Sequence, residues 1–165
     1  MIASLEEVLR VMHEHHVRCI VIGGWAAILH GAARTTNDVE LVCARDPDNL
    51  KALSEALGSR RPYLRGAPPG LPFRWDQRTI QGGLNFTLTT SLGDLDLLGE
   101  VPGGGTYEQL LPFTQEITID GVPERVVTLE RLIQLKRAAG RPKDLEAIAE
   151  LQALLEERQK SRPSF

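Results

Sequence analysis

Two acidic residues, Asp38 and Glu40, stand two positions apart in residues 37–43, a stretch predicted to form a strand. Side chains two apart on a strand point to the same side of a sheet, so both carboxylates share one face while Val39 and Leu41 take the other. Neighbouring carboxylates repel each other unless a cation lies between them. The pair therefore indicates a divalent cation site, and the alternative is a charged strand face in contact with solvent.

A third carboxylate is expected from a later strand, residues 94–98. There Leu95 and Leu97 face one way, while Asp94 and Asp96 face the other. Asp96 lies between the two leucines and is the better candidate, with Asp94, nearer the preceding turn, as the alternative. Three carboxylates on one face would supply oxygen ligands for two divalent ions, Mg²⁺ or Mn²⁺.

Gly23 and Gly24 separate an apolar strand, residues 17–22, from a short predicted helix, residues 25–30. A glycine pair at such a turn lets backbone N–H groups approach a phosphate, although on its own it often marks only a tight turn. With the acidic strand downstream, phosphate binding becomes the favoured interpretation. A phosphate cradle beside paired carboxylates predicts metal-assisted phosphoryl or nucleotidyl transfer.

Lys136 lies on the apolar face of a predicted helix, residues 129–139. Its spacing from Leu129, Leu132 and Ile133 places all four on one narrow stripe. A lysine there either extends to solvent or reaches an anionic group in a cleft, because burying an unpaired ammonium is costly. We favour an anionic partner, either a phosphate or a site carboxylate.

Other charged residues flank these motifs. Arg34 precedes the carboxylate strand, where it either neutralises a phosphate oxygen or bonds to carbonyls at a helix end. Arg141 and Lys143 lie just beyond the helix of Lys136 and would add positive charge. Asp144 is either a site residue or an acid that complements the dipole at the start of the next helix.

The elements that must position these residues indicate an α+β (α/β) fold, a mixed β-sheet flanked by helices. A single domain is expected over residues 1–158, with C-terminal helices over 129–158 and a frayed tail over 159–165. Further helices are predicted from about residue 5 and over 47–57, strands over 84–89, 116–119 and 125–127, and a long, mobile loop over 59–76.

Composition restricts the function classes. The chain has 165 residues, a formal net charge of −3 and two cysteines, Cys19 and Cys43, which are expected to be buried free thiols. A net acidic protein is a poor candidate for broad nonspecific nucleic-acid binding. The apolar runs are too short to span a membrane, and a cytoplasmic location is expected. One segment of this net acidic chain is locally basic. The loop 59–76 and the residues just beyond it carry five arginines, Arg60, Arg61, Arg65, Arg74 and Arg78.

The chain resembles the polymerase-β-like nucleotidyltransferase superfamily. The resemblance rests on three elements of the sequence, Gly23-Gly24, Asp38-Val39-Glu40 and Leu95-Asp96-Leu97. The spacing from the glycines to the acids, together with the closing stretch LERLIQLKRAAGRPKDLEAIAEL, is similar to minimal bacterial members of the abortive-infection, toxin–antitoxin type. Trp25 departs from the pattern, because many members have a small hydroxyl residue after the glycines.

The resemblance implies transfer of a nucleoside monophosphate from an NTP to a hydroxyl group, with two Mg²⁺ ions and release of pyrophosphate. Asp38 and Glu40 would hold the metals, and Asp96 would position or deprotonate the acceptor. Gly23 and Gly24 would cradle the β- and γ-phosphates. The charge of the triphosphate would be balanced by Lys136 with Arg141 or Lys143.

Three hypotheses about the function remain open at this point. The favoured acceptor is a partner protein or a tRNA, as in toxin–antitoxin or phage-defence pairs. The second hypothesis is an antibiotic nucleotidyltransferase, and the third is a non-catalytic antitoxin or binding module that keeps the fold. The sequence determines neither the preferred NTP nor the oligomeric state.

Overall fold

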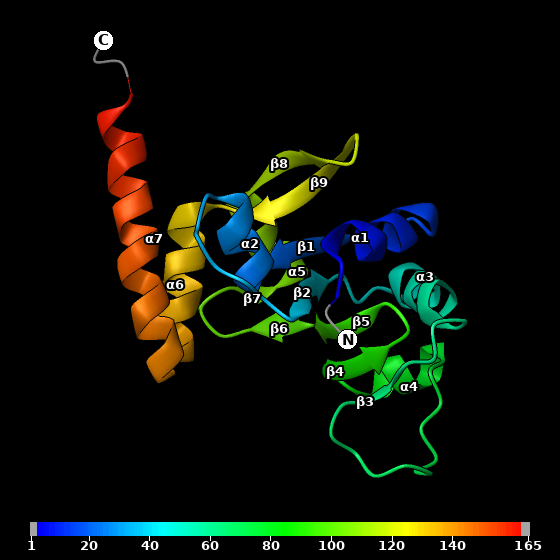
Figure 1. Cartoon of the computed structure of the whole chain (residues 1–165). Helices are drawn as coiled ribbons and strands as arrows, with labels where there is room; N and C mark the ends of the chain where they lie inside the picture. Colours follow the sequence, from blue (N-terminus) through cyan, green and yellow to red (C-terminus); the bar gives the residue numbers. More distant parts are fainter. Residues whose placement is uncertain (1–2, 163–165) are drawn as a thin grey trace.

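A seven-stranded mixed β-sheet forms the centre of the computed structural model, which describes residues 3–162. Its strand order is β3-β4-β5-β2-β1-β9-β8, and a separate two-stranded ribbon pairs β6 with β7 (Figure 1). The strands are β1 (Cys19–Ile22), β2 (Asp38–Cys43), β3 (Tyr63–Leu64), β4 (Asn85–Thr90), β5 (Gly93–Leu98), β6 (Glu100–Val101), β7 (Gly105–Thr106), β8 (Thr114–Ile119) and β9 (Val122–Val127). The predicted mixed sheet flanked by helices is confirmed.

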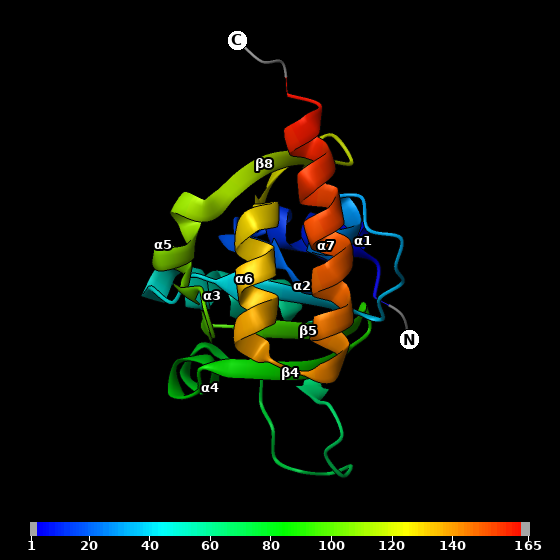
Figure 2. The same ribbon diagram turned by 90° about the vertical axis from the view of Figure 1, so that its left-hand side faces the viewer.

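Helices cover both faces of this sheet. They are α1 (Leu5–Glu14), α2 (Gly23–Leu29), α3 (Pro47–Leu57), α4 (Gln77–Gly82), α5 (Tyr107–Leu110), α6 (Leu129–Ala139) and α7 (Pro142–Lys160). Helices α6 and α7 stand side by side on one side of the sheet, whereas α1 and α3 lie on the other (Figures 1 and 2). None of these helices is both long enough and apolar enough to cross a bilayer.

Local sequence signals determine where the C-terminal helices begin and end. The Thr128 hydroxyl accepts a hydrogen bond from the Arg131 N–H and caps α6. Gly140 ends α6 in the left-handed conformation, with φ +66°, and Pro142 occupies the first turn of α7. Helix α7 ends at Lys160, two residues later than predicted, and residues 163–165 of the predicted tail lie outside the described part.

The central strands β2 and β5 run parallel and position the acidic residues. Their register sets Asp38 beside Asp94 and Glu40 beside Asp96. The apolar side chains between them, Val39 and Leu95 among others, are fully buried in the core. Alternation along each strand therefore directs the leucines and valines to the core and the carboxylates to the side where α6 and α7 stand.

The segment 59–76 differs from the expected mobile loop. It contains strand β3, which pairs antiparallel with β4, and its aromatic side chains pack in sequence from Tyr63 through Phe73 and Trp75 to Phe86 of β4. The Trp75 indole N–H also donates to the Leu53 carbonyl of α3 at 3.1 Å. Packing of these partly buried aromatic rings holds both ends of the segment against the sheet, while most of residues 66–72 is exposed. The Arg, Pro and Gly content of the segment did not indicate this long-range packing.

Candidate active site

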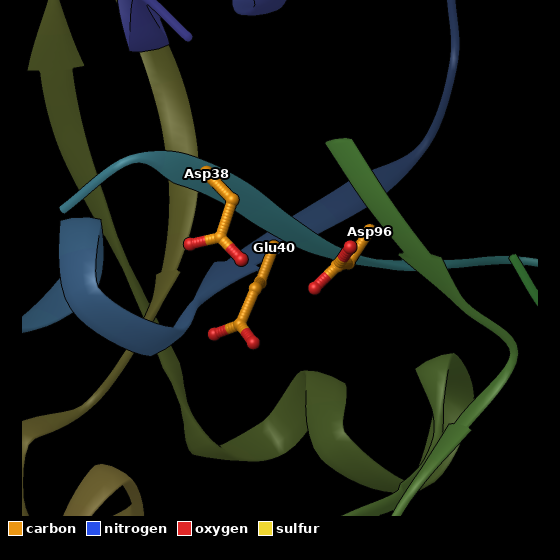
Figure 3. A group of neighbouring side chains, drawn as sticks. All are labelled: Asp38, Glu40 and Asp96. Carbon is orange, nitrogen blue, oxygen red and sulfur yellow. The ribbon is translucent and has the colours of Figure 1, made fainter. Parts of the chain in front are cut away.

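Asp38, Glu40 and Asp96 come together at the centre of the sheet. One carboxylate oxygen of each lies within 4.8 Å of the others, and the three groups gather on the same side of β2 and β5 (Figure 3). Asp94 lies on the same face beside Asp38 but is not part of this group. The geometry thus favours Asp96 over Asp94 as the third acid.

The residue types and the electrostatics of this cluster fit a divalent cation. Burial raises the pKa of Glu40, and the charges of Asp38 and Asp96 raise it further. Burial also raises the pKa of Asp96, although Arg65 opposes the shift. A cation between the three oxygens would remove this repulsion, and hard carboxylate oxygens are the ligands that Mg²⁺ and Mn²⁺ prefer.

The two glycines make room for this cluster. Gly23 adopts φ +69°, and a Cβ there would overlap the Glu40 carboxylate; a Cβ on Gly24 would lie 2.7 Å from Thr36 Oγ1. Glycine at these positions therefore lets α2 start directly against β2. Gly24 also lines the cavity described below, whereas Gly23 lines a neighbouring pocket together with Glu40.

The anionic partner of Lys136 is Asp144. Lys136 Nζ lies 3.6 Å from Asp144 Oδ1, and the Asp144 side chain is only 1% exposed. The second partner of this carboxylate is Arg141, whose Nε donates at 2.8 Å and whose backbone N–H donates at 3.1 Å. Asp144 therefore both caps α7 and holds two cations beside the acidic residues, and its role in a site stays a prediction.

The shifted pKa of Asp144 reflects these contacts. Burial acts to raise it, but the side-chain and backbone hydrogen bonds from Arg141, with the charges of Arg141 and Lys136, lower it on balance. Asp144 consequently stays charged, and it holds Lys136 and Arg141 beside the acidic cluster.

A cavity of about 410 Å³ opens in front of the three acids, between the sheet and helices α6 and α7. Arg34 lines it and pairs through Nε with Glu150 of α7 at 3.6 Å, rather than with carbonyls at a helix end. The cavity is acidic at the sheet, where Arg65 lies among the carboxylates, and mainly basic opposite, where Lys136, Arg141 and Lys143 line it. Arg34, from the segment between α2 and β2, adds a further positive charge. This distribution suits an anion that shares a cation with the carboxylates.

Two residues of the site, Arg65 and Thr36, were not predicted from the sequence to belong to it. The guanidinium of Arg65 lies 2.9 Å from Asp96 Oδ1, although this arginine belongs to the segment interpreted as a loop. Thr36 donates from its hydroxyl to Asp38 Oδ1 at 3.2 Å and so orients that carboxylate. The position of Thr36, two residues before Asp38, is a weak signal; Arg65 has none, because its approach depends on β3 pairing with β4.

Comparison with solved structures identifies the fold. Two crystal structures match this chain across most of its length. The lincosamide antibiotic adenylyltransferase LnuA, with lincomycin bound, has a TM-score of 0.61 and 14% identity over 93% of this chain and 98% of LnuA. ANT(2'')-Ia in complex with adenylyl-2''-tobramycin has a TM-score of 0.56 and 17% identity over 94% of this chain and 89% of ANT(2'')-Ia.

The chain thus has the fold of nucleotidyltransferases, as the resemblance to the polymerase-β-like superfamily implied. Identities this low show the fold alone, and the assignment to the minimal toxin–antitoxin branch stays a prediction. No protein-family model and no curated protein sequence matches the chain.

Proposed function

We propose that the protein is a metal-dependent nucleotidyltransferase that moves a nucleoside monophosphate from an NTP to a hydroxyl group. The observation that carries this proposal is the convergence of three carboxylates from two paired strands on a cavity whose opposite wall is basic. The nucleotidyltransferase fold supports the same reaction class.

Each part of the cavity has a role in this reaction. Asp38 and Glu40 would hold a divalent metal, Mg²⁺ or Mn²⁺, together with the triphosphate, and Asp96 would position or deprotonate the acceptor hydroxyl. When bound, the metal stabilises charge on the reacting phosphate and on the attacking oxygen. Gly24 leaves space for Thr36 and lines the cavity, where its backbone can approach a phosphate, and Gly23 leaves space for Glu40.

The basic wall neutralises the remaining charge of the triphosphate. Lys136 and Arg141 already lie beside the acids, held by Asp144, so binding requires little reorganisation. Lys143 and Arg34 extend this wall toward the opening. Pyrophosphate leaves from the same side, where its charge remains compensated.

We further propose a macromolecular acceptor, a partner protein or a tRNA, as in toxin–antitoxin or phage-defence pairs. Three exposed arginines, Arg61, Arg74 and Arg78, lie on or next to the segment that sends Arg65 into the site. Exposed positive charge on this segment suits a phosphate backbone or an acidic protein surface. The second candidate is antibiotic modification, which is favoured by the likeness to LnuA and ANT(2'')-Ia.

Two measurements test the reaction and its acceptor. An NTP should raise the melting temperature only when Mg²⁺ or Mn²⁺ is present, by mass action. A D38N/E40Q variant should lose this shift, and D48N, a matched change on the exposed start of α3, should keep it. A shift that persists in D38N/E40Q would contradict the metal site.

To identify the acceptor, the protein is incubated with Mg²⁺ and each of the four NTPs in turn, labelled at the α-phosphate. Separate reactions contain total tRNA, the product of the neighbouring gene, lincomycin or tobramycin. Label on tRNA or on the partner protein is expected, and R61Q/R74Q should reduce it. Label on an antibiotic alone would replace the macromolecular acceptor by the second candidate. Nucleotide binding without any transfer would contradict the enzyme and favour a binding module.

A further inference from the structure

Arg65 directs its guanidinium group at carboxylates from two neighbouring strands. Nη2 lies 2.9 Å from Asp96 Oδ1, Nε lies 3.5 Å from Asp94 Oδ2, and Nη1 lies 3.9 Å from Asp38 Oδ2. Among residues 3–162, no ion pair joins Arg65 to Glu40. The guanidinium therefore occupies the Asp96 side of the acidic cluster and leaves the Glu40 side open.

Hydrogen bonds to strand β4 hold Arg65 in this place at both ends. Its backbone N–H donates to the Thr87 carbonyl at 3.0 Å, and Nη2 donates to the Leu88 carbonyl at 2.8 Å. Only 26% of the side chain is exposed. A solvated surface arginine would keep its rotamer freedom, whereas Arg65 is fixed as part of the site.

Charge at the site explains what this arrangement does. Four carboxylates face one another across β2 and β5, and Arg65 is the cation in contact with three of them. A divalent ion that binds Asp38 and Asp96 together must approach this guanidinium, and like charges at a few ångströms repel strongly in a partly buried site. The ion and the arginine therefore compete for the same carboxylate oxygens.

We propose that Arg65 is a resident cation of the active site, which orients Asp96 and competes with a divalent ion on the Asp96 side. This inference rests on the proposed function. In the absence of nucleotide, Arg65 keeps metal affinity low, and the triphosphate supplies the additional negative charge that makes metal binding favourable. Metal and NTP accordingly bind together, and Arg65 is a positioning residue for Asp96.

The test measures binding of Mn²⁺ alone, as the decrease in free Mn²⁺ detected by electron paramagnetic resonance, without NTP or turnover. R65Q and R65M both remove the positive charge, and R65M keeps an apolar stem. If one variant fails to fold, Mn²⁺ binding is measured with the other. Either should bind Mn²⁺ about tenfold or more tightly than the wild type, because a positive charge next to the ion is lost. R74Q, the same charge change at an exposed position of the same segment, should match the wild type.

The outcomes separate this inference from the proposed function. Tighter Mn²⁺ binding in R65Q or R65M but not in R74Q supports the competition. Unchanged or weaker Mn²⁺ binding in chains that still bind NTP with Mg²⁺ would overturn the role of Arg65 and leave the proposed function standing. No Mn²⁺ binding by any chain, with or without NTP, would overturn both.

Discussion

Replacement of Asp144 by asparagine tests the buried charge that holds the basic wall of the site. The asparagine side chain would keep an oxygen that can accept from the Arg141 backbone N–H, so the cap of α7 can survive. The D144N variant loses the negative charge that faces Lys136 at 3.6 Å and Arg141 Nε at 2.8 Å. The expected effect is therefore that of the ion pairs, separated from that of the cap.

The magnitude follows from the exposure of each partner. The Arg141 side chain is 51% exposed, so solvent compensates part of that loss. Lys136 is only 16% exposed and would be left without its partner, which costs about 1–3 kcal/mol. Together we expect D144N to lower the free energy of unfolding by about 3 kcal/mol, or the melting temperature by about 10 °C for a chain of this length.

The pH dependence identifies the charge as the cause. Because the folded-state pKa of Asp144 is lowered, its contribution is complete above the unfolded value and is lost as the pH falls through the folded value. Urea unfolding should therefore separate D144N from the wild type fully at pH 7 and by about 1 kcal/mol less at about pH 3. D48N, an exposed acid in the first turn of α3, should change stability by less than about 0.5 kcal/mol.

Two results would refute this reasoning. A D144N chain as stable as the wild type at pH 7 would show that the ion pairs contribute nothing net. A loss of equal size at both pH values would assign the effect to packing or capping rather than to charge.

Two other predictions concern a glycine and a second acid. G23A should lower the free energy of unfolding by about 2–4 kcal/mol, because φ is +69° and the new Cβ would overlap the Glu40 carboxylate. Urea unfolding of G23A and G23A/E40A checks this. The overlap would be contradicted if adding E40A to G23A recovered none of the lost stability. Burial raises the pKa of Glu124 to about 7, above its unfolded value, so its charged form opposes folding at high pH. Thermal unfolding should show E124Q more stable than the wild type by about 1 kcal/mol at pH 8 and equally stable at about pH 4. The value at pH 8 is reduced because Glu124 is partly exposed. The same difference at both pH values would contradict this cause.

The sequence by itself determined the features that depend on local spacing. Alternation in residues 37–43 and 94–98 placed Asp38, Glu40 and Asp96 opposite the core, because side chains on a strand alternate with a period of two. Thr128 and Gly140 marked both ends of α6, because capping acts within a few residues of the helix end. These local rules indicated the strand faces and helix ends, but left Asp94 and Asp96 as alternatives for the third acid.

Only the tertiary structure decided how distant segments meet. The parallel register of β2 and β5 set Asp96 beside Glu40, and nothing within either strand encodes that register. Packing of α6 on α7 brought Asp144 to Lys136, and the pairing of β3 with β4 carried Arg65 to the acids. Such contacts depend on buried area and hydrogen bonds between different elements of the fold. The residues adjacent to Arg65 in the sequence therefore did not indicate that it lies next to the carboxylates.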